Sequence, residues 1–277
     1  MDYSPTKLKE KIDKHGFNFK KMYGQNFIVD ENIINSIIEK TNIDKDTLVI
    51  EVGPGAGSLT YKLANQSKNV LAYEIDTSLK DLLEENLKSL DNVEVKYEDF
   101  LKANVQNDID KYNYKKLYLV ANLPYYITTP IIMKIISDNI KVDKMVVMVQ
   151  KEVGDRFKAN PGTKDYGSLS VYLNYYFDVK KILDVSRTVF IPRPNVDSIV
   201  VEFERKKELK ELKNRELFFK LVRDSFKFKR KNIRNNLKSY DLKIVEEVLK
   251  KHKKDLTSRA EELELDIFID LANSLNK

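Results

Sequence analysis

The chain of 277 residues contains no cysteine, only two histidines, eight glycines and seven prolines. The absence of cysteine excludes disulfides, iron–sulfur clusters and thiolate zinc sites, and it is typical of proteins in a reducing cytoplasm. His15 and His252 are far apart in sequence, so we interpret them as surface residues and expect no metal centre. The overall composition, 42% hydrophobic and 33% charged, indicates a globular chain without low-complexity segments.

Long apolar runs are also missing. No stretch reaches the about 18 uninterrupted apolar residues of a membrane-spanning helix, and the charged N-terminal sequence lacks the apolar segment of a signal peptide. We therefore expect a soluble, cytoplasmic protein without a membrane partner. No extended apolar interface is indicated either, and we expect a monomer.

Charge is distributed unevenly along the chain. Residues 205–254 hold 19 Lys and Arg against seven Asp and Glu, a net charge of +12, whereas the whole chain carries only +6. A basic module attached to a mildly acidic one indicates a polyanionic partner, for which nucleic acid is the first candidate. The alternative is an ordinary solvated helical face.

Five short apolar runs recur at nearly even spacing, each followed by a stretch of helical periodicity. This alternation predicts an α/β fold with a mainly parallel sheet. Before the first run, Asp30 is expected to cap a helix with Ile33, Ile34, Ile37 and Ile38 on one face. The five predicted strands are Leu48–Val52, Val70–Glu74, Val93–Tyr97, Leu117–Ala121 and Met145–Gln150.

The pattern changes after Gln150. Residues 154–168 suggest a turn-rich loop, and the β-like stretches Leu169–Val185 and Asp197–Phe203 are expected to pair as antiparallel strands at the sheet edge. From about residue 205 the sequence is helical, and Ser258 with Glu261 resembles a capping box that opens a final helix. We therefore expect two domains, residues 1–207 and a small helical domain of residues 208–277.

A glycine-rich turn, Glu51–Gly57, follows the first predicted strand. Gly53 and Gly55 would permit a tight turn and close approach of a cofactor to the backbone. Glu74 ends the next strand, where a carboxylate can bind both hydroxyls of a ribose. A nicotinamide dinucleotide site uses nearly the same parts, although its usual spacing is GxGxxG and the spacing here is GxGxG.

Asp99 follows the third predicted strand. At the carboxyl end of a parallel strand, its carboxylate could accept a hydrogen bond from an adenine amino group. The alternative, which Asp99 alone leaves equally open, is that it caps the following helix.

The fourth predicted strand leads directly into Asn122-Leu123-Pro124-Tyr125. The N6 atom of adenine is a poor nucleophile because its lone pair is delocalised into the ring. If the Asn122 side-chain oxygen and the carbonyl of Leu123 or Pro124 accept its two N–H groups, the lone pair becomes available to a methyl donor. Tyr125 offers a face on which a flipped base can stack. Positioning and polarisation would then supply much of the catalysis, without a strong general base.

Several motifs in this order resemble the KsgA-type rRNA adenine dimethyltransferases, a Rossmann-like methyltransferase fold with a C-terminal helical domain. The resemblance covers residues 15–203 strongly and the basic helical part more loosely. The motifs are Gly24–Asp30, Glu51–Gly57, Asn122–Tyr125, Gln150–Val153, Tyr166–Leu169 and Phe190–Ser198.

The resemblance implies a cofactor, S-adenosylmethionine, and a position for each of its parts. It places Asn26 and Ile28 in contact with the cofactor and Gly53 beside its methionine portion. Glu74 would hold the ribose hydroxyls and Asp99 the adenine amino group. Asn122 would lie between the cofactor and the target base.

For the substrate, the resemblance implies two adjacent adenosines in the terminal hairpin loop near the 3′ end of 16S rRNA, dimethylated at N6 late in 30S assembly. Phe190 would stack on the target adenine opposite Tyr125, although core packing is the alternative. Phe226 and Phe228 could equally be core or base-stacking residues. The expected RNA-contacting residues are Arg223, Lys227, Lys229, Arg230, Lys231 and Arg234.

Three alternatives remain. An Erm-type enzyme would dimethylate one adenosine of 23S rRNA, but Leu123 and the long 150–170 segment fit the KsgA type better. A DNA adenine methyltransferase would need a sequence-reading insertion, which is not evident. A non-catalytic assembly factor of the same fold would be expected to have lost Gly53, Glu74, Asp99 or Asn122, and all four are present.

Overall fold

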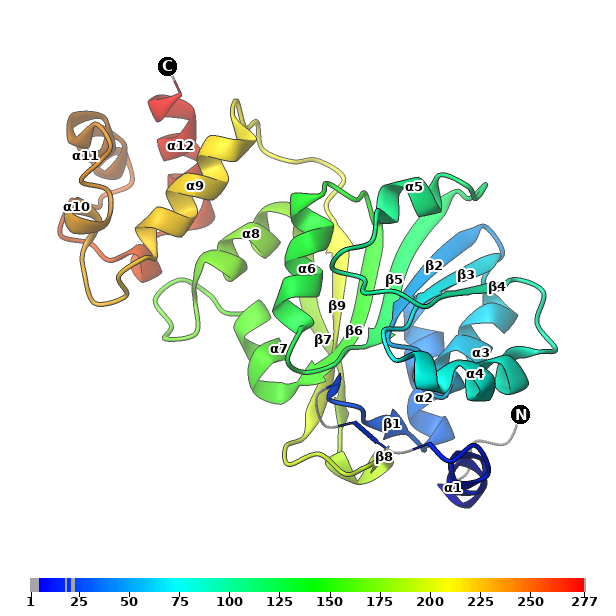
Figure 1. Cartoon of the computed structure of the whole chain (residues 1–277). Coiled ribbons are helices and arrows are strands. Elements are labelled where there is room, and N and C mark those ends of the chain that lie inside the picture. Colours follow the sequence, from blue (N-terminus) through cyan, green and yellow to red (C-terminus); the bar gives the residue numbers. More distant parts are fainter. Residues whose placement is uncertain (1–4, 18, 21–22, 277) are drawn as a thin grey trace. The chain divides into compact units, whose positions relative to one another are not determined.

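The computed structural model describes residues 5–17, 19–20 and 23–276. The chain forms two compact units, residues 1–154 with 180–204 and residues 155–179 with 205–277 (Figure 1). The first unit ends at Glu204, close to the expected boundary at residue 207. Residues 155–179, in contrast, group with the C-terminal part and not with the first domain. In the part of the chain that is described, no helix is long and apolar enough to cross a membrane.

The first unit is built on a seven-stranded sheet of order β4-β3-β2-β5-β6-β9-β7. Strands β2 to β6 pair in parallel, and β9 runs antiparallel to β6, which confirms the mainly parallel sheet with an antiparallel edge. The strands are β2 Thr47–Val52, β3 Asn69–Tyr73, β4 Val93–Lys96, β5 Lys116–Asn122, β6 Lys144–Gln150, β7 Phe177–Val185 and β9 Ser198–Arg205.

Helices alternate with the parallel strands, as the periodicity predicted. They are α2 Glu31–Thr41, α3 Ser58–Gln66, α4 Lys80–Leu87, α5 Val105–Ile109 and α6 Thr128–Ser137, with η2 Thr77–Leu79 before α4 and α1 Pro5–Lys14 near the N-terminus. The Asp30 side chain caps α2 by accepting hydrogen bonds from the backbone N–H groups of Asn32 and Ile33, which confirms the predicted cap.

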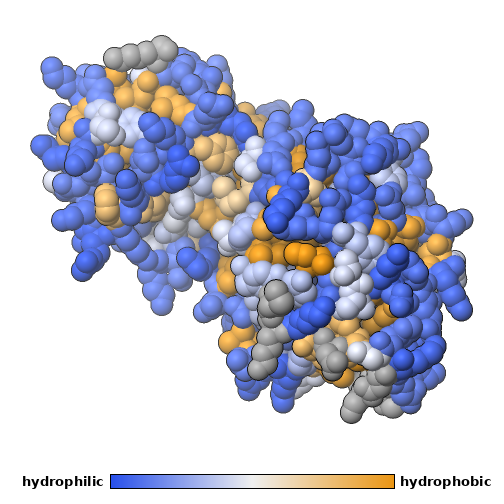
Figure 2. All heavy atoms as spheres, in the orientation of Figure 1, coloured by the Kyte–Doolittle hydropathy of each residue, from blue (hydrophilic) through white to orange (hydrophobic). Residues whose placement is uncertain are grey.

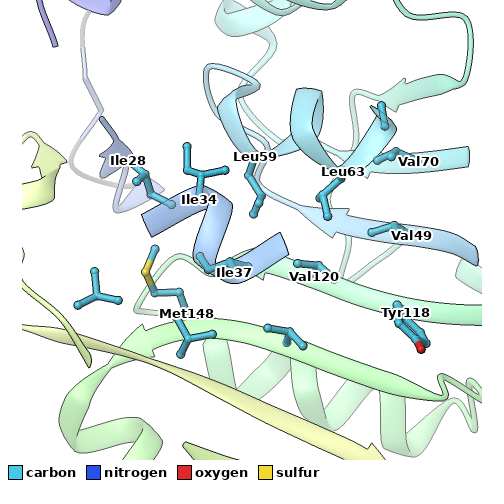
Figure 3. Packing of buried hydrophobic residues seen from close by; sticks show 14 of the residues in the cluster. Ile28, Ile34, Ile37, Val49, Leu59, Leu63, Val70, Tyr118, Val120 and Met148 are labelled. Atoms are coloured by element: carbon cyan, nitrogen blue, oxygen red, sulfur yellow. The ribbon is translucent and has the colours of Figure 1, made fainter. Parts of the chain in front are cut away.

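The core of this unit lies between α2, α3 and the sheet. Ile34 and Ile37 of α2 and Leu63 of α3 pack against Val49 of β2 and Val120 of β5 (Figure 3). All six residues of β2 are buried, as expected for a central strand covered on both faces. A separate two-stranded ribbon pairs β1 Phe27–Ile28 with β8 Phe190–Ile191, which follows the short η3 Arg187–Val189.

The predicted strand Leu169–Val185 is wrong in its first half. Residues Ser168–Tyr176 form helix α8, and only Phe177–Val185 form β7. The run of valine and tyrosine favours a strand by propensity. However, its buried residues include Val171, Tyr172, Tyr175 and Tyr176, a helical spacing that local propensity obscured. The predicted loop from residue 154 also begins later, because α7 covers Lys151–Phe157.

The second unit is helical. It contains α8, α9 Arg215–Ser225, α10 Ile233–Asn236, α11 Leu242–Lys251, η4 Ala260–Glu262 and α12 Leu265–Leu275. Its buried side chains include Phe218 and Leu221 of α9, Leu249 of α11 and Phe268 of α12. On the face of the molecule drawn in Figure 2, hydrophilic residues cover most of the surface.

The predicted capping box at Ser258 and Glu261 is also wrong. The final helix begins at Leu265 after Glu264, whose side chain makes no capping hydrogen bond. The Ser258 hydroxyl instead accepts a hydrogen bond from the backbone of Asp255, which tightens the preceding turn. An S-x-x-E pattern therefore marks a short 3-10 helix here and not the start of an α-helix.

Candidate active site

A cavity lies at the carboxyl ends of the central strands of the first unit. Its lining includes the residues that follow β2, β3 and β5, and Asp99 after β4. The strand order reverses between β2 and β5, and such a switch point is where ligands bind in open α/β sheets. The cavity brings together all the predicted cofactor-binding residues and Asn122–Tyr125, whereas Phe190 is not among the residues that line it.

The glycine-rich turn has the backbone conformation that the sequence predicted. Gly53 and Gly55 adopt φ values of 72° and 59°, in the left-handed region that favours glycine. A Cβ atom on Gly55 would lie 2.8 Å from the ring of Phe27. The space that Gly55 leaves is therefore taken by an aromatic ring of the N-terminal segment, which holds that segment against the turn.

Glu74 lies directly after β3 and is buried. Its Oε1 atom accepts a hydrogen bond from the Asp76 backbone at 2.8 Å, and its Oε2 atom accepts one from the Gly55 backbone at 3.2 Å. Burial raises the pKa of Glu74 to about 7, although these backbone hydrogen bonds oppose the shift. Each oxygen retains acceptor capacity for a hydroxyl group.

Glu51 is a second buried carboxyl of the cavity, which the sequence analysis noted in the motif but did not assign to the site. Burial raises its pKa to about 8, and the nearby charge of Glu74 adds to the shift. Its Oε2 atom has no hydrogen-bond partner among the described residues. A charged residue within a fully buried strand was the signal in the sequence, because such residues are rarely buried without a functional or pairing role.

The cavity is acidic. Four carboxyl side chains line it, Glu51, Glu74, Glu98 and Asp99, and none of the described residues of the lining is a lysine, arginine or histidine. Among the described lining residues a phosphate would find no side-chain counter-charge, so the pyrophosphate of a dinucleotide would depend on backbone N–H groups alone. A nucleoside that carries a positive charge fits this lining, since opposite charges attract strongly where water is partly excluded.

The Asn122–Tyr125 motif forms the turn at the end of β5. The Asn122 amide nitrogen donates to the Asn26 carbonyl oxygen at 2.9 Å, so its Oδ1 atom remains as an acceptor. The Pro124 carbonyl already accepts hydrogen bonds from the Ile127 backbone and the Thr128 hydroxyl. Of the two carbonyls that the sequence analysis proposed, the geometry therefore favours that of Leu123.

Two tyrosines stand at this turn. The Tyr125 hydroxyl and the Ser198 hydroxyl lie 2.9 Å apart, which fixes the Tyr125 ring beside the cavity. Tyr126, which the sequence analysis did not single out, also lines the cavity and is 52% exposed. Its ring packs over Gly24, where an added Cβ would lie 3.3 Å from it.

Phe190 occupies a different environment from the one expected of a base-stacking residue. Its side chain is only 3% exposed and packs in the core cluster with Ile28, its partner in the β1–β8 ribbon. The motif that contains Phe190 does reach the site, because Ser198 contacts Tyr125. In this structure the alternative of core packing therefore describes Phe190.

The remaining predicted cofactor residues lie around the mouth of the cavity. The Asn26 side chain donates to the Gly24 carbonyl, and Ile28 is buried in the lining. One oxygen of Asp99 accepts a hydrogen bond from the Leu101 backbone at 3.0 Å. Asp99 thus stabilises its own turn while it lines the cavity. The alternative of a helix cap is wrong, because the next helix, α5, begins at Val105 and is capped by Asn104.

The second unit presents the predicted basic residues on its surface. Arg223, Lys227, Lys229, Arg230, Lys231 and Arg234 are all exposed. Within the described part of the chain, none of them forms an ion pair with a carboxylate. Phe226 is partly buried and its ring packs on that of the buried Phe268, at 5.8 Å between ring centroids, whereas Phe228 is 55% exposed. The two phenylalanines therefore differ: the first packs against the core and the second is available to a ligand.

The fold and the acidic cavity define a Rossmann-like methyltransferase. Residues 16–277 match the model of a family described as ribosomal RNA adenine dimethylase. The chain is 49% identical over 240 residues to ribosomal RNA small subunit methyltransferase A of Staphylococcus aureus, covering 86% of this chain and 81% of that protein. The chain thus belongs to the ribosomal RNA adenine dimethylase family, which confirms the resemblance.

Solved structures agree with this assignment. A dimethyladenosine transferase from Plasmodium falciparum superposes with a TM-score of 0.72 at 25% identity, covering 89% of this chain and 96% of that one. The 23S rRNA methyltransferase ErmE superposes with a TM-score of 0.69 at 27% identity, covering 91% and 100%. Identity is therefore much higher to the small-subunit relative than to the large-subunit enzyme.

Proposed function

We propose that this protein uses S-adenosylmethionine to dimethylate the N6 atoms of two adjacent adenosines in the terminal hairpin loop near the 3′ end of 16S rRNA. The observation that carries the proposal is the open acceptor of Asn122 beside a cavity lined by carboxyl side chains. The 49% identity to a small-subunit methyltransferase supports the choice of ribosomal subunit.

The residues of the cavity fit this cofactor. Glu74 would hold the ribose hydroxyls and Asp99 the adenine amino group, with Gly53 and Gly55 beside the methionine portion and Asn26 and Ile28 as further contacts. When bound, S-adenosylmethionine supplies an electrophilic methyl group on a positively charged sulfur. Burial raises the pKa of Glu51 and Glu74, and a bound cation would favour the ionised form of both carboxyls, so cofactor binding and their ionisation would support each other.

The chain's own residues then prepare the nucleophile. The Asn122 Oδ1 atom and the Leu123 carbonyl accept the two N–H groups of the target adenine, which directs the N6 lone pair toward the donor. Tyr125, held by Ser198, supports the base by stacking. The proton that N6 loses after methylation passes to water, because neither an amide oxygen nor a peptide carbonyl is basic enough to keep it.

The second unit would bind the rRNA. Its six exposed Lys and Arg side chains can neutralise phosphates, which makes binding strongly dependent on salt. A hollow of this unit is lined by Lys229, Lys231, the exposed ring of Phe228, Arg156 and Lys164. We propose this surface as the RNA-contacting part of a cytoplasmic monomer that acts on the 30S subunit or its precursor late in assembly.

The test is methyl transfer from labelled S-adenosylmethionine to unmethylated small subunits, with large subunits in parallel, followed by mapping of the modified bases. We expect label on two adjacent adenosines of 16S rRNA. Label on the large subunit alone would identify an Erm-type activity. Binding to small subunits without transfer would identify an assembly factor instead of an enzyme.

A further inference from the structure

Asp76 is a buried carboxylate that the proposed mechanism does not use. Its side chain is 1% exposed, and it lies two residues after Glu74 without lining the cavity. Its Oδ1 atom accepts hydrogen bonds from the Lys20 ammonium at 2.7 Å and from the Ser78 backbone at 3.1 Å. Its Oδ2 atom accepts one from the Gln25 amide at 2.8 Å.

These partners keep the buried carboxylate ionised. Burial alone would raise the pKa of Asp76, but the hydrogen bonds from Lys20, Ser78 and Gln25 hold it below its ordinary value. Burying a charged carboxylate costs free energy unless several donors bind it. A turn cap would need only the hydrogen bond from Ser78. The contacts to Lys20 and Gln25 reach 56 and 51 residues back along the chain and need a separate explanation.

On one side, Asp76 is joined to the proposed ribose ligand. Its backbone N–H donates to the Oε1 atom of Glu74 at 2.8 Å, opposite the hydrogen bond from Gly55 to Oε2. These two backbone donors fix the plane of the Glu74 carboxyl. The position of the Asp76 backbone therefore sets the direction in which Glu74 presents its free lone pairs.

On the other side, Asp76 is joined to the methyl-transfer site through the N-terminal segment. The Gln25 side chain donates a hydrogen bond to Asp76, and Gln25 immediately precedes Asn26. The Asn26 carbonyl oxygen in turn accepts a hydrogen bond from the side-chain amide of Asn122. The Oε1 atom of Gln25 also accepts a hydrogen bond from the Lys20 backbone at 2.8 Å. Both ends of the Gln25 amide are thus satisfied, and residues 23–27 form one wall of the cavity.

We propose that Asp76 is a positioning residue for the cofactor: its carboxylate holds the 23–27 wall through Gln25 and Lys20, and its N–H orients Glu74. This inference rests on the proposed function. It predicts a defect in cofactor binding and not in the transfer step, because Asp76 touches neither the cofactor cavity nor the target base.

Asp76→Asn tests the proposal, since asparagine keeps the size but cannot form the ion pair with Lys20 or accept from every donor. We expect the Kd for S-adenosylhomocysteine, measured by calorimetry, and the KM for S-adenosylmethionine to rise by about tenfold to 100-fold. The kcat at saturating cofactor should stay within about threefold of wild type. An unchanged Kd, or a loss in kcat alone, would overturn the proposal.

Ser78→Ala is the matched control, because it removes a hydroxyl that donates to the same Oδ1 atom and accepts from Lys20, but leaves the direct contacts of Asp76 with Gln25 and Lys20 in place. If Asp76 only caps the turn, both variants should lower Tm alike and leave Kd unchanged. If Asp76→Asn does not fold, the same Kd is measured for Gln25→Met and Lys20→Met. An unchanged Kd for S-adenosylhomocysteine in both variants would contradict the proposal. A wild-type protein that binds no S-adenosylhomocysteine would refute the proposed function instead.

Discussion

The side-chain amide nitrogen of Asn122 lies 2.9 Å from the carbonyl oxygen of Asn26, to which it donates a hydrogen bond. This contact settles which end of the Asn122 amide is free, since only the nitrogen can donate to a carbonyl. The oxygen is left for the target base. A residue of the N-terminal segment thus determines how the proposed catalytic residue of β5 is oriented.

Asn122→Ala should retain cofactor binding but lower kcat by about 100-fold or more, because it removes an acceptor positioned for the reacting nitrogen. Calorimetry with S-adenosylhomocysteine and methyl transfer to small subunits measure the two effects. Asn65→Ala, an exposed asparagine whose amide contacts only the Tyr61 carbonyl, is the control and should behave as wild type. Near-normal turnover of Asn122→Ala would refute the polarisation mechanism.

Glu51→Gln should stabilise the protein at alkaline pH. Burial raises the pKa of Glu51 to about 8 and that of Glu74 to about 7, so both carboxyls hold their protons more tightly in the folded state than in the unfolded state. The contribution of these two carboxyls to the free energy of unfolding should therefore be largest below about pH 5 and be lost as the pH rises to about 8.

Replacing Glu51 by a neutral isostere removes part of this dependence. We expect the Tm of Glu51→Gln at about pH 8 to exceed that of wild type by about 3 °C or more, with a smaller difference at about pH 5. Thermal unfolding at several pH values measures this. Glu152→Gln, at an exposed position, should leave the pH profile unchanged. Equal Tm values at both pH extremes would show that Glu51 is not a buried, destabilising charge.

Phe190 can be tested for its two possible roles separately. Phe190→Ala should lower stability by about 3–5 kcal/mol, because it deletes a buried ring from the core. Phe190→Leu should fold and retain most of the methyl transfer, since it keeps an apolar side chain in the cluster. If Phe190→Leu folds normally but loses transfer, the ring must leave the core and stack on the base during the reaction.

The basic surface of the second unit should control the salt dependence of RNA binding. Replacing Lys229, Arg230 and Lys231 by glutamine should weaken binding to small subunits and reduce the slope of log K against log salt by about 2 to 3. The triple replacement of Lys243, Lys250 and Lys251 in α11 removes the same charge elsewhere and should have a smaller effect. Equal losses from both would indicate non-specific attraction by net charge.

The centre of the sheet could be predicted well because β2, β5 and β6 are buried on both faces and leave nearly unbroken apolar runs. Helix α2 could also be predicted, because its N-terminal cap, Asp30, is followed by isoleucines at helical spacing. The prediction was wrong at Ser168–Tyr176, where tyrosine and valine favour a strand locally but pack on one side of a helix. Tertiary packing determined the helical conformation of this segment, and the residues against which it packs lie far along the chain.

For the site, the sequence indicated which residues gather at the strand ends, because parallel strands bring their carboxyl ends to one edge. It did not indicate the contacts made from outside the sheet. The fit of Phe27 against Gly55 and the hydrogen bonds of Asp76 to Lys20 and Gln25 join segments without any periodic relationship. For Phe190 the sequence left core packing and base stacking open, because a proline-rich turn can direct a ring inward or outward, and the structure shows core packing.

The acidic lining of the cavity has a consequence for turnover. Methyl transfer converts a positively charged sulfonium into a neutral thioether, so the attraction that acts on the sulfonium is lost when the product forms, while the charged amino and carboxyl groups of the methionine portion remain. The carboxyls that line the cavity therefore attract the product less strongly than the donor. The reaction thus weakens the binding of its own by-product, which favours the exchange of cofactor that successive methylations of one RNA require.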